Sequence, residues 1–175
     1  MFAVAKIGAI LVPINTRFRT QDLEYVLTQS DCAYLICHDV SGPIDYMKMV
    51  RDVVVLPAKG TAIADPERPE MRAVITVSNE KHSGAVSWPE LLTASGGVED
   101  DALATRAAAV DPDDPVFFMY TSGTTGFPKG AVHTHNLLRL IVFRAKHMTM
   151  SENDVILNYL PLFHLFGFSE GALMS

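Results

Sequence analysis

The chain has 175 residues, 49% of them hydrophobic, and carries 20 acidic against 14 basic side chains. This composition suffices for one hydrophobic core, and the lack of a basic stripe argues against a nucleic-acid-binding surface. Since no apolar run reaches membrane-spanning length, we expect a soluble, cytoplasmic protein with no transmembrane segment and no nucleic acid among its partners.

The first residues look like the interior of a domain rather than a signal peptide. Met1–Ile7 has helical spacing, Gly8 ends that helix, and Ala9–Ile14 reads as a buried strand. Basic residues are scarce before the apolar run, and Pro13 interrupts it, which argues against a signal peptide. Because the helix starts without a capping residue, we expect the chain to be truncated at this end.

Helices and strands alternate over the next hundred or so residues, a pattern typical of a layered α/β architecture. Apolar residues at helical spacing, such as Leu23, Val26 and Leu27, indicate the helices, and short β-branched runs indicate the strands. The expected helices are Thr20–Gln29 with Thr20 as its cap, Pro43 to about Val53, Ser87–Leu92 with Ser87 and Glu90 as a capping box, and Ala102–Val110; the expected strands are Ala33–Cys37 and Ala73–Val77.

Some features of this stretch have a less definite pattern. Val53–Leu56 fits either a helix end or a strand, and its periodicity does not distinguish the two. Thr61–Pro69 is polar and contains proline, so it is expected to be a surface loop. Cys32 and Cys37 match no common zinc motif and are expected to be two buried thiols in a reducing compartment.

The stretch from Val116 to His133 carries the strongest functional signal. Val116–Tyr120 reads as a buried strand and Ala131–His133 resumes a strand-like pattern, so Thr121–Lys129 (TSGTTGFPK) is expected to be a hairpin loop. Its glycines let backbone N–H groups approach a ligand, its hydroxyls add donors, and Lys129 adds a positive charge. Such a loop suits a polyphosphate, although its spacing is not that of the kinase and GTPase phosphate loop. An ordinary hairpin turn is the alternative.

The alternation continues to the end of the chain. A helix is expected over Leu137–Met148, capped by Asn136 or Thr134. A strand over Asp154–Leu160 leads into Pro161–Gly167, and a last helix starts at Phe168 and runs to Met174. The core-facing residues expected on the first of these helices are Leu138, Ile141, Val142 and Ala145.

Several histidines and one phenylalanine have two interpretations each. His164 stands among apolar neighbours, so it is either a core histidine bonded to the backbone or a site residue. Phe166 fits core packing and the lining of a binding pocket equally well. His133 and His135 alternate on one strand face, but two ligands without a nearby carboxylate or thiol are a weak metal signal, and we predict no metal ligand.

Three stretches resemble, in order and spacing, segments of the adenylate-forming enzymes, a family that includes acyl-CoA synthetases, luciferases and peptide-synthetase adenylation domains. Thr121–Lys129 resembles the signature loop of that family. Ala5–Ala9 with Pro13–Asn15 resembles its early segment, and Leu160–Gly167 (LPLFHLFG) resembles a later one. The last segment and the stretch Asn15–Phe18 look most like the acyl-CoA synthetase branch.

The resemblance implies a fold, a reaction and a set of site residues. A carboxylic acid, fatty or related, attacks the α-phosphorus of ATP to give an acyl-adenylate and pyrophosphate, and the thiol of coenzyme A then attacks the acyl carbon. Magnesium is implied with the ATP, without a ligand in this chain. The implied catalytic residues are Lys129 and His164, with His164 orienting the reacting groups as a donor. The implied substrate-binding residues are His164 and Phe166, and the implied ATP-binding residues are Thr121, Ser122, Gly123, Thr124, Thr125, Gly126 and Lys129. Phe127 is expected to be a tolerated surface position, and Lys6 is given no catalytic role.

The family's later segments have no room before Ser175. They supply most adenine and ribose contacts, an acidic magnesium ligand, a hinge and the catalytic lysine of a small C-terminal domain. We therefore expect residues 1–175 to be a fragment of one AMP-binding N-terminal domain, truncated at both ends and unable to complete adenylation alone. Another branch (aryl-CoA ligase, luciferase-like enzyme or amino-acid adenylation domain) and a non-catalytic nucleotide-binding remnant are the alternatives. Neither the acid nor the oligomeric state follows from the sequence.

Overall fold

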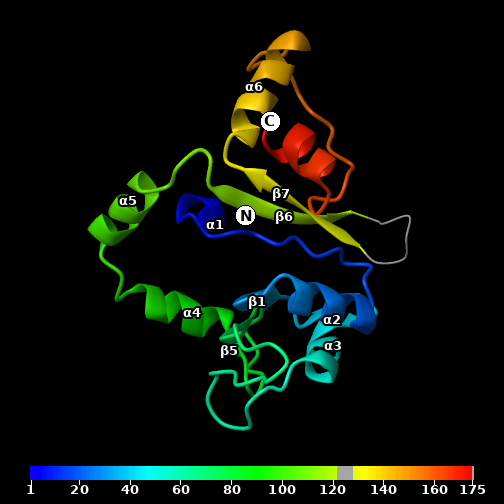
Figure 1. Cartoon of the computed structure of the whole chain (residues 1–175), viewed down its shortest axis with the longest axis vertical. Helices are drawn as coiled ribbons and strands as arrows, with labels where there is room; N and C mark the ends of the chain where they lie inside the picture. The colour runs from blue at the N-terminus through cyan, green and yellow to red at the C-terminus, as the bar shows by residue number, and fades with distance from the viewer. Residues whose placement is uncertain (122–127, 175) are drawn as a thin grey trace. The chain divides into compact units, whose positions relative to one another are not determined.

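The computed structural model describes residues 1–121 and 128–174. Two compact units make up the chain (Figure 1): unit 1 comprises Met1–Thr16 and Asp100–Ser175, and unit 2 is the continuous segment Arg17–Glu99. Both units combine helices with strands, which confirms the predicted α/β class. Nowhere in the described ranges is a helix long and apolar enough to cross a membrane.

Unit 2 is built on a three-stranded parallel sheet with the order β1-β4-β5. Its strands are β1 (Tyr34–Cys37), β4 (Ala73–Thr76) and β5 (Val86–Ser87). The central strand β4 buries Val74, Ile75 and Thr76, because it is covered on both faces. The predicted strands Ala33–Cys37 and Ala73–Val77 are confirmed to within one residue at their ends.

Three helices belong to unit 2: α2 (Thr20–Gln29), α3 (Tyr46–Val53) and α4 (Trp88–Ser95). The apolar face of α2 is buried as predicted, through Leu23, Val26 and Leu27, and α3 contributes Met47, Val50 and Val53 to the same core. The predicted Ser87–Glu90 capping box is present, since Ser87 donates from its backbone N–H and from Oγ to Glu90 Oε2, at 3.0 and 2.7 Å. Helix α4 runs three residues beyond the predicted Leu92.

The first turn of α3 follows a small hairpin that the sequence pattern did not reveal. Strands β2 (Val40–Ser41) and β3 (Ile44–Asp45) pair antiparallel around Gly42, whose φ of +57° suits a glycine. Asp45 then caps α3, and its carboxylate accepts a hydrogen bond from the Lys48 N–H at 2.7 Å. The helix therefore begins at Tyr46 rather than Pro43.

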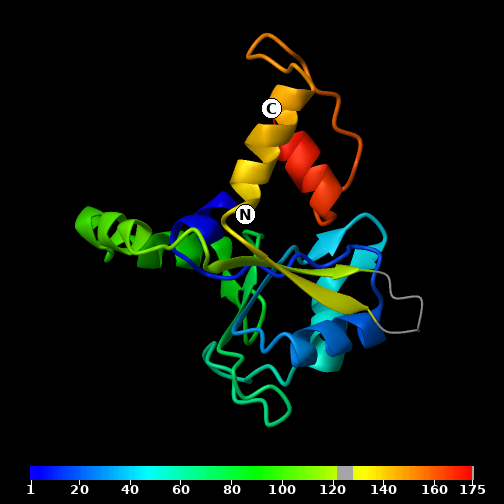
Figure 2. The same ribbon diagram turned by 45° about the horizontal axis from the view of Figure 1, so that its top comes forward.

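Unit 1 is organised on a two-stranded antiparallel hairpin of β6 (Pro115–Thr121) and β7 (Lys129–Thr134). Figure 2 shows the two long strands from a second direction. The unit also contains α1 (Phe2–Lys6), α5 (Asp100–Ala108), α6 (Leu137–His147) and the π-helix η1 (Gly167–Ala172). Its core consists of Val116, Phe117 and Met119 from β6 together with Phe168 from η1.

Three predictions about regular structure are wrong, and the alternative left open for Val53–Leu56 is decided. Ala9–Ile14 makes only one bridge, Leu11 to Phe117, because the chain turns at Gly8 and Pro13 has no N–H to extend a ladder. Asp154–Leu160 is not a strand: Val155 and Leu157 are 96% and 87% exposed, and no strand among the described residues pairs with it. Thr20 is the first residue of α2 and not its cap; the cap is Arg19, whose N–H bonds the Asp22 carboxylate at 2.9 Å. Val53–Leu56 forms no strand, since α3 ends at Val53.

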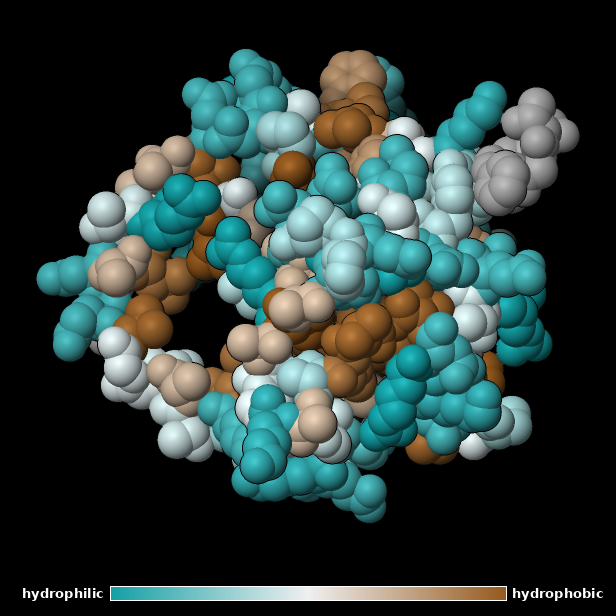
Figure 3. Space-filling model, turned by 60° about the horizontal axis from the view of Figure 1, so that its bottom comes forward, coloured by the Kyte–Doolittle hydropathy of each residue, from teal (hydrophilic) through white to brown (hydrophobic). Residues whose placement is uncertain are grey.

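The exposure of two segments also differs from expectation. On α6 only Ile141 is buried, whereas Leu138 and Val142 are 52% and 54% exposed, because the core of unit 1 meets this helix along a narrow stripe. The loop Thr61–Pro69 includes buried Asp65 and Arg68, which pair with each other at 3.0 Å and so tolerate burial. Hydrophobic residues remain at the surface, and Figure 3 shows such areas among hydrophilic ones on one face.

Candidate functional site

The ends of strands β6 and β7 hold the two described ends of the predicted phosphate loop. Thr121 and Lys129 are paired in register, and Thr121 Oγ1 donates a hydrogen bond to the Lys129 backbone carbonyl at 3.3 Å. The predicted hairpin is thereby confirmed up to these two residues. The other predicted loop residues, which are Ser122, Gly123, Thr124, Thr125, Gly126 and Phe127, lie outside the described residues.

Lys129 is exposed, and it has no ion-pair partner among residues 1–121 and 128–174. Its ammonium group is therefore available to an anion approaching the loop. The hydroxyl hydrogen of Thr121, by contrast, is already engaged by the Lys129 carbonyl. For Thr121 to donate to a phosphate, that hydrogen bond has to break.

A glycine beside Lys129 lets the two strands approach closely. A Cβ at Gly130 would lie 2.3 Å from Cε2 of Phe118, whose ring covers this position on the neighbouring strand. Phe118 also contacts the Tyr120 ring at a centroid distance of 5.2 Å. The strand end that presents Lys129 is thus defined by aromatic packing as well as by backbone hydrogen bonds.

His164 lies in a turn that precedes η1. Its N–H donates to the Pro161 carbonyl at 3.1 Å, its own carbonyl accepts from Phe168 N at 3.0 Å, and its ring contacts the Phe163 ring at 4.6 Å between centroids. The side chain is exposed, so the interpretation of His164 as a core histidine is wrong. Phe166 is 55% exposed, and core packing is excluded for it as well.

The helix after His164 is fixed to the hairpin strand. Phe168 is 2% exposed, and its ring meets the Phe117 ring edge to face at 4.9 Å. Arg144 of α6 pairs with Glu170 of η1 at 2.7 Å. The segment that carries His164 and the loop end that carries Lys129 therefore share strand β6 as their support. No hydrogen bond or ion pair joins Lys129 to His164 in the described part of the chain.

His133 lies in β7, and His135 follows that strand at the junction with α6. The His135 N–H donates to the Asp114 carbonyl at 3.2 Å, and Asn136 occupies the cap position of α6. The Asn136 side chain does not cap the helix, because its Nδ2 donates to Asp113 Oδ1 instead. Neither histidine belongs to a candidate ligand group among the described residues.

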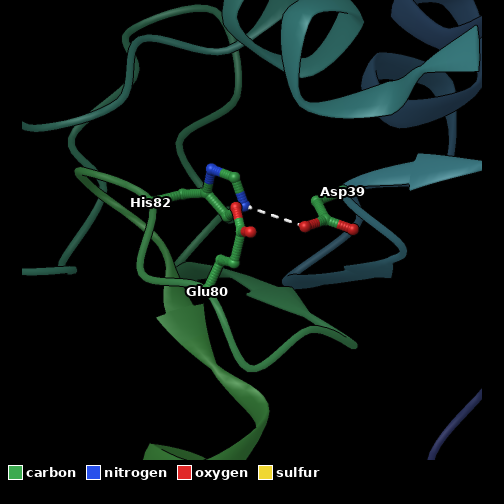
Figure 4. Close-up of side chains that lie close together, drawn as sticks. All are labelled: Asp39, Glu80 and His82. Atoms are coloured by element: carbon green, nitrogen blue, oxygen red, sulfur yellow. Dashed lines mark hydrogen bonds and ion pairs between the residues drawn. The ribbon is translucent and has the colours of Figure 1, made fainter.

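Sequence reasoning missed a cluster in unit 2. The candidate ligand atoms of Asp39, Glu80 and His82 lie within 4.8 Å of one another (Figure 4). His82 Nε2 is 3.2 Å from Asp39 Oδ2, and Asp39 Oδ1 accepts from the Val40 N–H at 2.8 Å. A hydrogen bond from Ser78, then those from Val40 and His82, lower the pKa of Asp39 to about 2. These bonds already satisfy Asp39, and Glu80 is exposed, so we interpret the cluster as a hydrogen-bonded histidine and aspartate with an acidic neighbour. The signal was weak, since Asp39 lies far from Glu80 and His82 in sequence.

A hollow of about 430 Å³ also lies in unit 2, lined by Lys81, Ser87, Glu90 and their neighbours at the start of α4. Two of its lining residues, Lys81 and Glu90, form an ion pair at 2.7 Å. Neither of the site residues Lys129 and His164 lines it.

The cysteines are free and half-buried, and burial raises the pKa of Cys37 to about 11 and also raises that of Cys32.

Comparison with known proteins places these features in a family. The sequence model described as "AMP-binding enzyme" matches residues 1–175. YngI of Bacillus subtilis, which carries the name acyl-CoA synthetase, is 35% identical over 98% of this chain and 32% of its own length. The long-chain-fatty-acid–CoA ligase FadD13 of Mycobacterium tuberculosis is 31% identical over 94% of this chain and 27% of its own length.

The fold agrees with this match. The crystal structure of a long-chain-fatty-acid–CoA ligase, FadD1 of Archaeoglobus fulgidus, superposes with a TM-score of 0.61 at 23% identity, covering 99% of this chain and 29% of that one. The chain spans about a third of the length of the curated relatives it matches. Since the family model covers all 175 residues, the chain belongs to the AMP-binding enzyme family.

Proposed function

We propose that the protein containing this chain joins a carboxylic acid, fatty or related, to coenzyme A in an ATP-dependent reaction that passes through an acyl-adenylate. The supporting observation is the hairpin of β6 and β7, which presents an exposed Lys129, without an ion-pair partner in the described part of the chain, at the end of the loop Thr121–Lys129. The relatives named above carry the names of acyl-CoA synthetases and ligases. Both units are, in this proposal, parts of one large N-terminal domain of a cytoplasmic enzyme.

The first step has an electrostatic problem that the loop is suited to solve. A carboxylate must approach the α-phosphorus of a polyanion, and fixed positive charge and amide donors lower the repulsion. In the proposal Lys129 binds the β- and γ-phosphates together with the backbone groups of residues 121–126 and the hydroxyl groups of Ser122, Thr124 and Thr125. Because Lys129 sits on a strand and not on a free loop, its backbone position is set before ATP binds.

His164 has a different role in the proposal. Its exposed ring projects from a turn whose backbone is hydrogen bonded on both sides. As a donor it would orient the acid carboxylate against the α-phosphate, and Phe166, also exposed, would line the acyl pocket. Magnesium is expected with the polyphosphate, but we assign it no ligand here, because the only candidate group among the described residues is the Asp39 cluster in unit 2.

The alternatives predict different products. Another branch of the family would release pyrophosphate with an aryl or amino acid, or form AMP without turnover of coenzyme A. A nucleotide-binding remnant would bind ATP without any acid-dependent reaction. The glycines, hydroxyls and lysine of the loop support adenylation in general, and the acid panel described below decides between the branches.

The test uses the product of the full open reading frame. Pyrophosphate release is measured with ATP, magnesium, coenzyme A and a panel of fatty, aryl and amino acids. Lys129→Ala is compared with Lys146→Ala, which removes an exposed lysine from the last turn of α6. Release that depends on a fatty acid, on coenzyme A and on Lys129 but not Lys146 is the expected result. Release with no acid dependence, or equal activity of the two variants, would overturn the proposal.

A further inference from the structure

Asn158 holds the backbone on both sides of the turn that carries His164. Its Oδ1 accepts a hydrogen bond from the Leu160 N–H at 3.1 Å, before the turn. Its Nδ2 donates to the Gly167 carbonyl at 3.2 Å, after the turn. One side-chain amide thus joins the two ends of the segment 160–167, with His164 between them.

The side chain of Asn158 packs so closely against η1 that there is no room for a side chain at Gly171. A Cβ at Gly171 would lie 2.0 Å from Asn158 Nδ2 and 2.2 Å from its Cγ. A Cβ at Gly167 would lie 2.4 Å from the Pro161 carbonyl oxygen, so the turn itself is equally tight. Both glycines are buried. Asn158 therefore fits against η1 because Gly171 lacks a side chain, and the absence of a side chain at Gly167 leaves room for the turn.

The helix that Asn158 binds is of an unusual kind. Gly167–Ala172 is a π-helix, and at its end the Leu173 N–H donates to the Phe168 carbonyl five residues back, at 3.1 Å. Such wide turns occur mostly as single-turn features and are frequent at functional sites. The far side of this helix is fixed by Phe168 on Phe117 and by Arg144 on Glu170. Only the side toward residues 158–160 depends on Asn158.

We propose that Asn158 is a positioning residue that sets the orientation of His164 for acyl-adenylate formation. The inference rests on the proposed function, since it assumes that His164 contacts the reacting groups. Asn158 itself touches no substrate: it fixes the ends of the turn, and the turn fixes the imidazole. No role for Asn158 follows from the sequence, because the residue pattern predicts a strand over Asp154–Leu160, in which its side chain would have no such partners.

The kinetic test compares substitutions at Asn158 in the full-length protein. Asn158→Ala removes both hydrogen bonds, and Asn158→Asp keeps the acceptor for Leu160 but loses the donor to Gly167. A small misplacement of a reacting group lowers the rate by one to two orders of magnitude, so we expect kcat to fall about tenfold in Asn158→Ala and less in Asn158→Asp. The KM for ATP should change by less than about twofold, because Lys129 belongs to the hairpin.

Two further variants separate positioning from a general structural role. If Asn158 acts through His164, adding Asn158→Ala to His164→Ala should cause no further loss of kcat, since the two changes are then non-additive. Gly171→Ala should reproduce Asn158→Ala by displacing the amide. Gly97→Ala is its matched control, because a Cβ there meets only the Ala94 carbonyl oxygen, at an ordinary 3.7 Å.

A measurement that does not depend on turnover completes the test. Protein labelled with ¹³C at histidine Cε1 is compared with His164→Ala to assign the His164 signal, and Asn158→Ala should shift or broaden that signal. Wild-type protein without acid-dependent pyrophosphate release would contradict the proposed function, while this spectrum would still report on Asn158. An unchanged His164 signal, an unchanged kcat, or a full additional loss in the double variant would each overturn the positioning role.

Discussion

Thr121 Oγ1 donates to the backbone carbonyl of Lys129, eight residues further along the chain, at 3.3 Å. This hydrogen bond closes the last residue pair of the β6–β7 ladder, where the loop begins and ends. Of the residues assigned to ATP, Thr121 and Lys129 are described: Thr121 is bonded to the protein, and the Lys129 ammonium group has no ion-pair partner within residues 1–121 and 128–174. Their substitution should have different consequences.

Thr121→Val and Lys129→Ala should separate stability from nucleotide binding. Thr121→Val removes one long, exposed hydrogen bond, so we expect at most about 1 kcal/mol of lost stability and a small change in the KM for ATP. Lys129→Ala removes a charge-assisted contact worth roughly 1.5–3 kcal/mol, which is about 10- to 100-fold in kcat/KM, with unchanged stability. Thermal melts measure the stability of both variants, and initial rates measure their kcat/KM. A large loss of kcat/KM in Thr121→Val with little change in Lys129→Ala would show that Thr121 is the phosphate ligand.

Gly130→Ala should destabilise unit 1. The added Cβ would lie 2.3 Å from the Phe118 ring, so either the ring or the strand has to move. Overpacking of this kind typically costs about 1–3 kcal/mol. The measurement is the urea midpoint, with Gly97→Ala as the control because its Cβ would meet nothing closer than 3.7 Å. Equal midpoints for the two variants would show that the Phe118 ring moves aside freely.

The buried pair in unit 2 should show strong coupling. Asp65 and Arg68 pair at 3.0 Å with side chains 1% and 3% exposed. Burial alone would raise the pKa of Asp65, but hydrogen bonds from Val55 and Glu67 N–H and the Arg68 guanidinium together lower it. Asp65→Ala leaves a buried cation, and we expect about 3 kcal/mol of destabilisation. Adding Arg68→Met should recover part of this loss.

The control for the Asp65 and Arg68 substitutions is an exposed ion pair between a basic and an acidic side chain. Lys48 and Asp52 lie 3.1 Å apart on α3, with side chains 71% and 46% exposed. Asp52→Ala should cost less than about 0.5 kcal/mol, because solvent screens such pairs. Denaturant midpoints for Asp65→Ala, Arg68→Met, the double variant and Asp52→Ala give the comparison. Additive effects of the Asp65 and Arg68 substitutions would mean that the pair contributes no coupling energy.

The capping box should give unit 2 an acid-dependent stability. Lys81, then the Ser87 N–H and hydroxyl, lower the pKa of Glu90 from 4.5 to about 2. A carboxyl with a depressed folded-state pKa stabilises the fold fully above its unfolded pKa and loses that effect as the pH falls through the folded value. The stability difference between wild type and Glu90→Gln should therefore be constant above about pH 4.5 and shrink toward pH 2. Melts across that range test it, and a difference that grows on acidification would contradict it.

The two thiols should react slowly in the folded chain. Burial, followed by the charge of Asp39, raises the pKa of Cys37 to about 11, so little thiolate exists at pH 8. Labelling by a disulfide reagent should be slow in buffer and complete at two thiols per chain in urea. A control with a small free thiol gives the unhindered rate. Fast labelling of one thiol in buffer would identify a reactive cysteine.

The parts of the fold that were predicted are those set by local pattern. Leu23, Val26 and Leu27 recur at helical spacing and are buried together, and Ser87 with Glu90 forms the expected capping box. The strands beside the loop were recognised because an apolar run ends abruptly in glycines and hydroxyls. In each case the residues that decide the structure are within a few positions of one another.

The parts that were missed depend on partners far away in sequence. Val155 and Leu157 alternate like strand residues, but no described strand pairs with them. Leu138 and Val142 lie on the apolar side of α6 and still remain half exposed. For the candidate site, Lys129 follows from its motif and His164 from its segment. The packing of Asn158 against η1 does not follow from a motif, because it depends on the glycine that lies opposite this side chain in the fold.

The division into units has a consequence for the order in which the protein is made. Unit 2 is continuous, so all its partners are available once residue 99 has left the ribosome. Unit 1 is split, and Leu11 must wait for Phe117 before their bridge forms. During that interval the first residues of the chain, including the exposed Phe2 and Ile10, have no completed core to join. Chaperone binding during translation is therefore expected to concentrate on residues 1–16, which are synthesised before unit 2 but complete their fold after it.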